Sequence, residues 1–218
     1  MKFPKMFTLW RKDEDSNWTI VEGDFAKQEF KSVQDWIVTE KVDGTNIRVY
    51  WHFKDELVEF RGRTDDAVIP VPLLAYLEKI FSVDLFKGIS PEADIVLFGE
   101  GYGPKIQAKG HLYRDDPSFI LFDAVIGGWW LNYDKVVALA EDLGIDVVPC
   151  FGIMNIEQIT SFVRSKKRSL VAFKDVEMEG VVAKSYPLML FRNGDPVMFK
   201  LRVADYAKLE RTKRCGVD

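Results

Sequence analysis

The sequence is poor in the residues that build metal cages and disulfide frameworks. Its 218 residues include only two histidines and two cysteines, Cys150 and Cys215. So few residues of these types argue against a zinc centre and against a Cys–His catalytic pair. The two cysteines lie far apart without metal-ligand spacing, so they are expected to be free thiols in a reducing compartment.

Long hydrophobic runs and a strong net charge are also missing. No apolar run of 18 residues and no signal peptide occur, so a soluble, cytoplasmic protein is expected. Lysine and arginine number 30 against 34 aspartates and glutamates, which gives a net charge of −4. No global field therefore attracts a polyanion. Nucleic-acid binding would depend on local basic stretches such as 105–114 and 164–168, each typical of a solvated surface when taken alone.

Apolar residues are plentiful, at 47% of the chain, which is enough for one sizeable core. Short apolar or alternating runs predict strands at residues 35–41, 46–53, 57–63, 95–98, 119–125, 180–184 and 197–202. Helical spacing predicts helices at residues 70–86, 134–143 and 156–163. Gly144 is expected to end the second of these helices. Hairpins mixed with helices indicate an α+β fold with mainly antiparallel sheets.

The most informative stretch is Glu40-Lys41-Val42-Asp43-Gly44-Thr45-Asn46, at the end of an expected strand. It places one lysine between two carboxylates, directly before a glycine turn. A lysine in that position is a candidate covalent nucleophile rather than a surface charge. A single Lys-x-Asp-Gly is a weak signal, because by composition it should occur in about one chain of this length in twenty. The order of the polar residues that follow strengthens it.

Further polar clusters interrupt the apolar strands, each at a strand end. They lie at residues 61–64, 98–103, 122–123, 179–184 and 200–202. Charged residues beside apolar strands are costly to bury unless they meet each other or a ligand. The clusters carry lysines and arginines, which suit phosphate, and carboxylates, which suit a hydrated divalent cation or ribose hydroxyls. A nucleoside triphosphate with magnesium would satisfy all of them.

This order closely resembles the covalent nucleotidyltransferase superfamily of ATP-dependent ligases and mRNA capping enzymes. Its nucleophile motif, Lys-x-(Asp/His)-Gly, is matched by Lys41, Asp43 and Gly44. Its later motifs are matched in order at residues 98–100, 179–184 and 200–202. Within the superfamily the chain looks most like the nick-sealing RNA ligases of phages and of kinetoplastid RNA editing. The shared details are Gly-Thr-Asn after the nucleophile, an Arg-Thr about twenty residues on, and Gly-Glu-Gly-Tyr-Gly-Pro, found here at residues 44–46, 63–64 and 99–104.

The resemblance spans residues 40–202 and implies the nucleotidyltransferase fold of these enzymes. In that α+β fold, mainly antiparallel sheets are flanked by helices and hold the nucleotide between them. Residues 1–218 are expected to form one adenylyltransferase domain, without the OB-fold or the C-terminal helical domain of larger relatives. The domain is expected to be monomeric, and a partner protein is expected to supply binding of the RNA end or nick.

The function implied by the resemblance is ATP-dependent RNA ligation with ATP and Mg²⁺ or Mn²⁺ as cofactors. Lys41 would attack the α-phosphorus of ATP and form a lysyl-AMP intermediate. The AMP would then pass to an RNA 5′-phosphate, and a 3′-hydroxyl would attack to seal the strand, including nicks in a duplex. The step at Lys41 is an in-line phosphoryl transfer, in which positioning and charge stabilisation supply most of the catalysis.

The resemblance also implies a role for each matched residue, with Lys41 as the nucleophile. The nucleotide-binding residues would be Glu40, Asn46, Arg63, Glu100, Phe122, Lys184, Lys200 and Arg202. The metal would be held through water by Asp43, Glu100 and Glu179. Glu40 would contact the adenine amino group, and Phe122 would stack on the adenine ring. Arg202 stands where the family has a second lysine, and it keeps the charge but cannot deprotonate.

Two other classes of function fit parts of the sequence. A DNA ligase or a capping-type guanylyltransferase shares the motifs, but DNA ligases usually carry arginine where Asn46 stands. A non-catalytic module that binds RNA ends in a nucleotide-dependent way would use the same residues without a covalent adduct. Taken alone, single residues also fit a purely structural role. Phe122 is typical of a buried strand, and Lys41 is typical of a solvent-exposed surface.

Overall fold

The computed structural model describes residues 1–15, 18–89 and 92–215, with side chains described up to residue 212. The chain forms two compact units. Unit 1 comprises Met1–Phe3, Val42–Val148 and Val171–Lys174, and unit 2 comprises Pro4–Lys41, Pro149–Leu170 and Asp175–Asp218. The chain therefore passes from unit 2 to unit 1 between Lys41 and Val42, inside the Lys-x-Asp-Gly motif.

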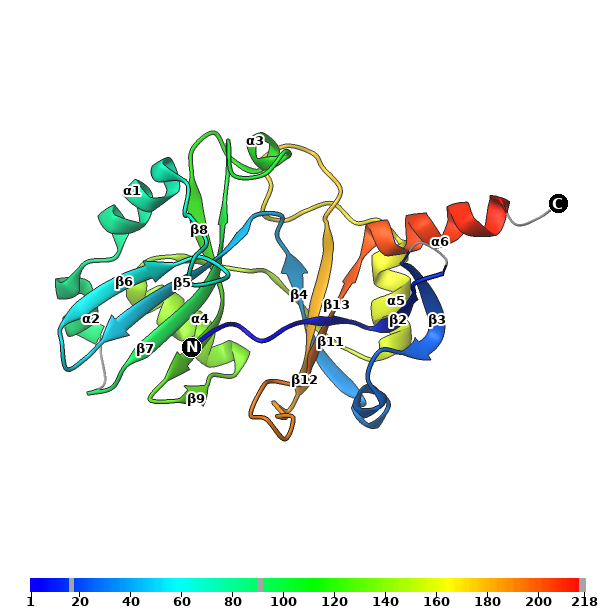
Figure 1. Ribbon diagram of the computed structural model, residues 1–218, viewed down its shortest axis with the longest axis horizontal. Coiled ribbons are helices and arrows are strands. Elements are labelled where there is room, and N and C mark those ends of the chain that lie inside the picture. The colour runs from blue at the N-terminus through cyan, green and yellow to red at the C-terminus, as the bar shows by residue number, and fades with distance from the viewer. Residues whose placement is uncertain (16–17, 90–91, 216–218) are drawn as a thin grey trace. The chain divides into compact units, whose positions relative to one another are not determined.

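Unit 1 is built on one twisted sheet (Figure 1). Its strands run in the order β10 (Asp146–Val147), β8 (Ser118–Ile126), β7 (Ile95–Tyr102), β5 (Thr45–His52) and β6 (Leu57–Arg61), and β9 (Trp129–Trp130) pairs with β8. Only the pairing of β10 with β8 is parallel in this sheet. The helices of unit 1 are α1 (Val71–Ile80), α2 (Val83–Ile89), α3 (Gly110–Tyr113) and α4 (Tyr133–Leu143).

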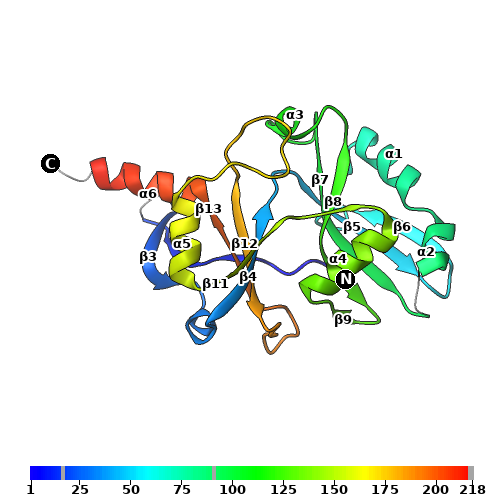
Figure 2. The same ribbon diagram turned by 180° about the vertical axis from the view of Figure 1, so that it is seen from behind.

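One face of this sheet packs against helices. Side chains alternate between the two faces of a strand, and in β5 the buried face carries Ile47, Val49 and Trp51. These residues share a core with Leu77 of α1 and Val136 of α4, and Figure 2 shows α4 lying along the sheet. Full burial of each large apolar side chain contributes about 1.5–3 kcal/mol. The other face of β5 carries the polar residues Asn46, Arg48, Tyr50 and His52.

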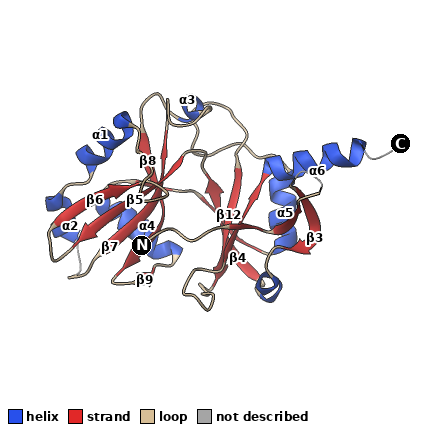
Figure 3. Cartoon of the chain, in the orientation of Figure 1, coloured by secondary structure: helices blue, strands red, loops and turns tan. Residues whose placement is uncertain are grey.

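Unit 2 is built on a second sheet (Figure 3). Its strands run in the order β1 (Phe7–Thr8), β13 (Met198–Arg202), β12 (Gly180–Tyr186), β4 (Asp35–Lys41) and β11 (Cys150–Met154). Only β1 and β13 pair in parallel. The remaining elements are the ribbon of β2 (Trp10–Asp13) and β3 (Thr19–Phe25), the 3₁₀ turn η1 (Gln28–Ser32), α5 (Ile156–Arg164) and α6 (Val203–Cys215).

The core of unit 2 lies between its sheet and the helices α5 and α6. Val38 of β4 and Val181 of β12 are fully buried there with Ile159 of α5 and Tyr206 of α6. Helix α5 begins at a capping box, in which Asn155 and Gln158 bond to each other's backbone N–H groups. Such reciprocal bonds satisfy two donors that a helix start otherwise leaves unpaired.

The expected α+β fold with mainly antiparallel sheets is confirmed, as is the hairpin of β5 and β6. Gly144 ends α4 in the left-handed conformation, at φ 64°, as predicted. The single helix expected over 70–86 is wrong, because the chain forms α1 and α2 instead. Phe81 is extended, and the Ser82 hydroxyl accepts a hydrogen bond from the Leu85 backbone N–H at 3.1 Å, which starts a new helix.

The structure also describes the lengths of the helices and the state of one cysteine. Within the part of the chain that the structure describes, no helix is long and apolar enough to cross a membrane. Cys150 is a free thiol, and the side chain of Cys215 lies outside the described residues.

Candidate functional site

The sheet of unit 2 gathers basic side chains on one face. Lys41 of β4 lies opposite Gly180 of β12, and Gly180 lies opposite Arg202 of β13. Residues directly opposite in neighbouring strands share a face, so Lys41 and Arg202 point to the same side. Alternation places Lys184 and Lys200 on that side too. The structure therefore brings four predicted site residues of unit 2 to one face, away from the apolar core.

Lys41 makes an ion pair with Glu179. Its Nζ lies 2.6 Å from Glu179 Oε2, and both side chains are about three-quarters buried. Gly180, the next residue, has φ 156°, and a Cβ there would lie 2.2 Å from the Leu201 carbonyl oxygen. Only glycine fits there, so β12 can run close to β13 directly after Glu179. The predicted nucleophile and a predicted metal-binding carboxylate are thus direct neighbours.

Glu40 lies on the other face of β4, with Val38, and only 2% of it is exposed. Its carboxylate accepts hydrogen bonds from the Ser169 hydroxyl and, at 2.8 Å, from the Leu170 backbone N–H. A buried carboxylate is costly unless such donors surround it. The sequence held no signal for Ser169 or Leu170, because they are more than a hundred residues away. The adenine contact expected of Glu40 stays a prediction.

In unit 1, Asn46 and Glu100 are direct neighbours across β5 and β7. The loop before β5 packs tightly on β7, because a Cβ at Gly44 would lie 2.3 Å from the Gly101 carbonyl oxygen and 2.7 Å from Glu100 Cγ. Gln107 Nε2 donates a hydrogen bond to the Gly44 carbonyl at 3.1 Å. The glycine of the nucleophile motif is therefore required by close packing, and Gln107 is a contact that motif matching did not assign.

The Asn46 amide oxygen is buried and has no hydrogen-bond partner. An orphaned acceptor beside a carboxylate fits a donor brought by a ligand, such as a metal-bound water or a sugar hydroxyl. Within residues 1–15, 18–89 and 92–212, no group of three or more His, Cys, Asp or Glu side chains is arranged to hold a metal ion directly. Magnesium usually keeps several waters and takes one or two protein carboxylates with substrate phosphates. The donors present fit a cation held in that manner.

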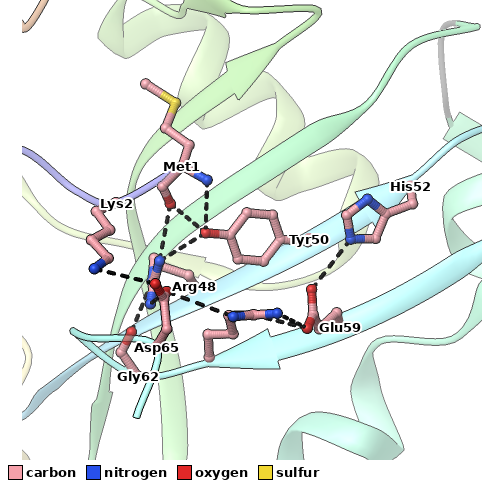
Figure 4. A network of polar contacts seen from close by, with 9 residues as sticks. Met1, Lys2, Arg48, Tyr50, His52, Glu59, Gly62 and Asp65 are labelled. Atoms are coloured by element: carbon pink, nitrogen blue, oxygen red, sulfur yellow. Dashed lines mark hydrogen bonds and ion pairs between the residues drawn. The ribbon is translucent and has the colours of Figure 1, made fainter. Parts of the chain in front are cut away.

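Arg63 lies in an exposed turn. A buried arginine, Arg48, bonds to Gly62 and Asp65 on either side of it (Figure 4). Arg48 is only 1% exposed. Its Nε donates to the Gly62 carbonyl at 2.8 Å, and its Nη2 donates to Asp65 Oδ1 at 2.9 Å. The same guanidinium also bonds to the Tyr50 hydroxyl at 2.9 Å. Motif matching identified Arg63 but missed Arg48, which holds the backbone directly before it.

Phe122 of β8 is half-buried and belongs to the apolar packing of unit 1. The Phe3 ring meets it edge to face, with centroids 5.0 Å apart. Such pairs contribute about 0.5–1.5 kcal/mol beyond their buried area. Phe122 therefore has a structural role in unit 1, and its stacking on adenine stays a prediction.

Comparison with known protein families identifies a match. The sequence profile of the family described as RNA ligase matches residues 34–202 of this chain. The chain belongs to the RNA ligase family. A sequence comparison with curated proteins gives no significant match.

Solved structures agree on the fold of this RNA ligase family member. A variant of Naegleria gruberi RNA ligase with AMP and manganese matches with a TM-score of 0.67 and 19% identity, over 98% of this chain and 58% of that one. The same ligase with pyrophosphate matches with a TM-score of 0.66 and 19% identity, over the same shares of the two chains. The predicted nucleotidyltransferase fold is thus confirmed. The chain spans about 58% of the length of these ligases.

The last matched motif of this RNA ligase family member, at residues 200–202, ends in Arg202, which Asp205 holds. Asp205 lies in the first turn of α6, and its carboxylate accepts hydrogen bonds from Arg202 Nη2 and Lys12 Nζ, both at 2.9 Å. Burial by itself raises the pKa of Asp205, but the bonds from Arg202 and Lys12 outweigh it and leave the pKa below its ordinary value of 3.8. An acidic residue three positions after a helix N-cap is a known sequence signal, whereas nothing in the sequence points to Lys12.

The low pKa of Asp205 makes the stability of this chain pH-dependent. A carboxyl whose folded-state pKa is depressed stabilises the fold above its unfolded-state pKa, and that contribution is lost as the pH falls through the folded-state pKa. Asp205→Asn should therefore lower the free energy of unfolding by about 1.5–3 kcal/mol at pH 7. The difference between variant and wild type should shrink below about pH 4. Urea denaturation from pH 7 to pH 3 measures this difference, and a constant difference would contradict the prediction.

Proposed function

We propose that this chain is the nucleotidyltransferase part of an ATP-dependent RNA ligase, and that residues 1–218 act as one adenylyltransferase domain. The observation that carries the proposal is the ion pair of Lys41 with Glu179, at 2.6 Å, at the motif positions of a family member. The carboxylate holds the lysine in place, and Lys200 and Arg202 on the same sheet face supply positive charge for a phosphate.

In the proposed reaction the Lys41 ammonium gives a proton to water, the free amine attacks the α-phosphorus of ATP, and a second proton leaves the nitrogen for water. A P–N bond forms, the bond from the α-phosphorus to the bridging oxygen breaks, and pyrophosphate leaves. Lys184, Lys200 and Arg202 bind phosphate or ribose oxygens and stabilise the charge that develops. The catalytic contribution of the chain is mainly positioning, because little covalent chemistry remains for the protein in phosphoryl transfer.

The carboxylates of Asp43, Glu100 and Glu179 would hold a divalent cation through water. When bound, that cation supplies positive charge that neutralises the phosphates and the leaving pyrophosphate. Asn46 supports this assignment, since its orphaned amide oxygen would accept a hydrogen bond from a metal-bound water or from the nucleotide. Arg63 and Phe122 are assigned to the nucleotide by their motif positions.

The later steps follow from the same assignment. AMP passes from Lys41 to the 5′-phosphate of an RNA, and a neighbouring 3′-hydroxyl then attacks and releases AMP. We propose RNA ends, including nicks in a duplex, as the substrate. We also propose that the domain is monomeric and that a partner supplies tighter binding of the RNA end.

Mass spectrometry after incubation with ATP and Mg²⁺ or Mn²⁺ tests the proposed function. The expected result is a mass gain of one AMP, removed by acid because a P–N bond is acid-labile. GMP transfer from GTP in place of AMP would favour a capping-type guanylyltransferase. ATP binding without any adduct would favour the non-catalytic module. Sealing of a labelled 5′-phosphate RNA, but not of the matching DNA, would assign the substrate.

A further inference from the structure

Asp205 joins two cations that come from distant parts of unit 2. Its Oδ1 accepts hydrogen bonds from Arg202 Nη2 and Lys12 Nζ, both at 2.9 Å. Its Oδ2 accepts from the Arg202 Nε at 3.3 Å and from the Arg202 backbone N–H at 3.2 Å. One edge of the guanidinium is thus held by both carboxylate oxygens. This geometry fixes the orientation of the planar Arg202 guanidinium group.

The side chains of Lys12, Asp205 and Arg202 together carry a net positive charge. A single Arg–Asp pair would be neutral, and a neutral pair attracts a phosphate only weakly. Lys12 adds a second positive charge to the same carboxylate, so the triad of Lys12, Asp205 and Arg202 carries a net charge of about +1 near neutral pH. The triad therefore keeps both a fixed orientation and an attraction for anions.

The Asp205 side chain is buried, whereas that of Arg202 is partly accessible. The Asp205 side chain is 4% exposed, whereas that of Arg202 is 34% exposed. Asp205 thus acts on a ligand through Arg202, and not by contact of its own. Arg202 belongs to the sheet face of Lys41, so Asp205 orients one of the basic side chains of that face.

We propose that Asp205 is a positioning residue that presents the Arg202 guanidinium to a phosphate group, with Lys12 keeping the triad cationic. The proposal rests on the proposed function only for the identification of that phosphate as part of a nucleotide. Asp205 also accounts for an arginine at a position that is usually lysine. A planar guanidinium binds phosphate through two parallel hydrogen bonds, so it gains more than an ammonium group from a fixed orientation.

Binding of inorganic tripolyphosphate, measured by calorimetry, tests this role without any covalent step. Asp205→Asn keeps the shape of the side chain and an oxygen that can accept from the Arg202 backbone N–H, but it removes the negative charge. Because the variant also raises the net charge of the triad to about +2, binding is measured at about 1 M salt, where that added attraction is largely screened. There the variant is expected to bind tripolyphosphate about tenfold more weakly, because the Arg202 guanidinium loses its fixed orientation. In an Arg202→Ala background the same change should alter affinity by less than about twofold, because the residue through which it acts is gone.

Glu22→Gln is the matched control. It removes the charge of another carboxylate of unit 2, which pairs with Arg164 at 2.6 Å, and it should leave the affinity unchanged. An equal loss from Asp205→Asn in both backgrounds, or no loss in either, would overturn the proposal. If Asp205→Asn fails to fold in a thermal melt, Lys12→Met replaces it. That variant should weaken binding about threefold and flatten its salt dependence, and an unchanged affinity would overturn the role of the triad.

The two proposals fail separately. If the wild-type protein binds tripolyphosphate as described but never forms an AMP adduct, the proposed function is rejected and the role of Asp205 stands. If the adduct forms but the double-mutant comparison shows no coupling, Asp205 is a structural residue and the proposed function stands.

Discussion

Replacing Lys41 with arginine is expected to abolish formation of the AMP adduct while leaving the fold intact. A guanidinium remains protonated throughout the working pH range and offers no free amine to attack phosphorus. It keeps the positive charge, so the ion pair with Glu179 has a partner. The rate of adduct formation should fall by a factor of at least about 10⁴. Single-turnover assays with labelled ATP measure that rate, and calorimetry should show that ATP still binds.

Lys54→Arg is the control for this experiment, since it makes the same chemical change in the exposed turn between β5 and β6. Its adduct yield should equal that of the wild type. An adduct on Lys41→Arg would have to sit on another residue, and its detection by peptide mapping would overturn the assignment of the nucleophile.

Replacing Glu179 with alanine should produce the second largest loss. The change removes the direct partner of Lys41, at 2.6 Å, and one of the three carboxylates assigned to the divalent cation. Loss of a preorganised charge of this kind in a catalytic site lowers rates by about 10²–10³-fold. Adduct formation should fall by that amount, and excess Mg²⁺ should restore little of it.

Glu177→Ala makes the same change two residues away, where the side chain is exposed, and should keep the wild-type rate. Glu179→Gln separates charge from shape, because glutamine can still bond to the lysine but attracts neither an ammonium group nor a metal. It should lose nearly as much activity as alanine. A wild-type adduct yield in Glu179→Ala would remove both roles from the residue.

The regular elements were the most predictable part of the fold. The strand at Asp35–Lys41 and the hairpin of β5 and β6 follow from apolar runs and alternation, which depend on neighbouring residues. The break between α1 and α2 was not predicted, since apolar spacing continues through Phe81 while the Ser82 cap interrupts the helix. Helix α6, β2 and β3 were missed as well. They carry few apolar residues in a regular pattern and are stabilised by contacts with the rest of unit 2.

Motif order identified the basic face of unit 2 because the sheet register turns sequence motifs into neighbours. Lys41, Gly180 and Arg202 come from three motifs and form one row across β4, β12 and β13. Strand alternation places Glu40 on the opposite face of β4 from Lys41, and its adenine contact stays a prediction. No motif contains Ser169, which holds that carboxylate.

By itself the sequence determined the family and the chemical type of each matched residue, and it proposed Lys41 as the nucleophile, because these depend on residue identity and order. Only the tertiary structure decided which residues support them. Asp205 and Lys12 hold Arg202, and Arg48 holds the turn that carries Arg63. Hydrogen bonds between residues far apart in the chain depend on how strands and helices pack, and no local pattern records that packing.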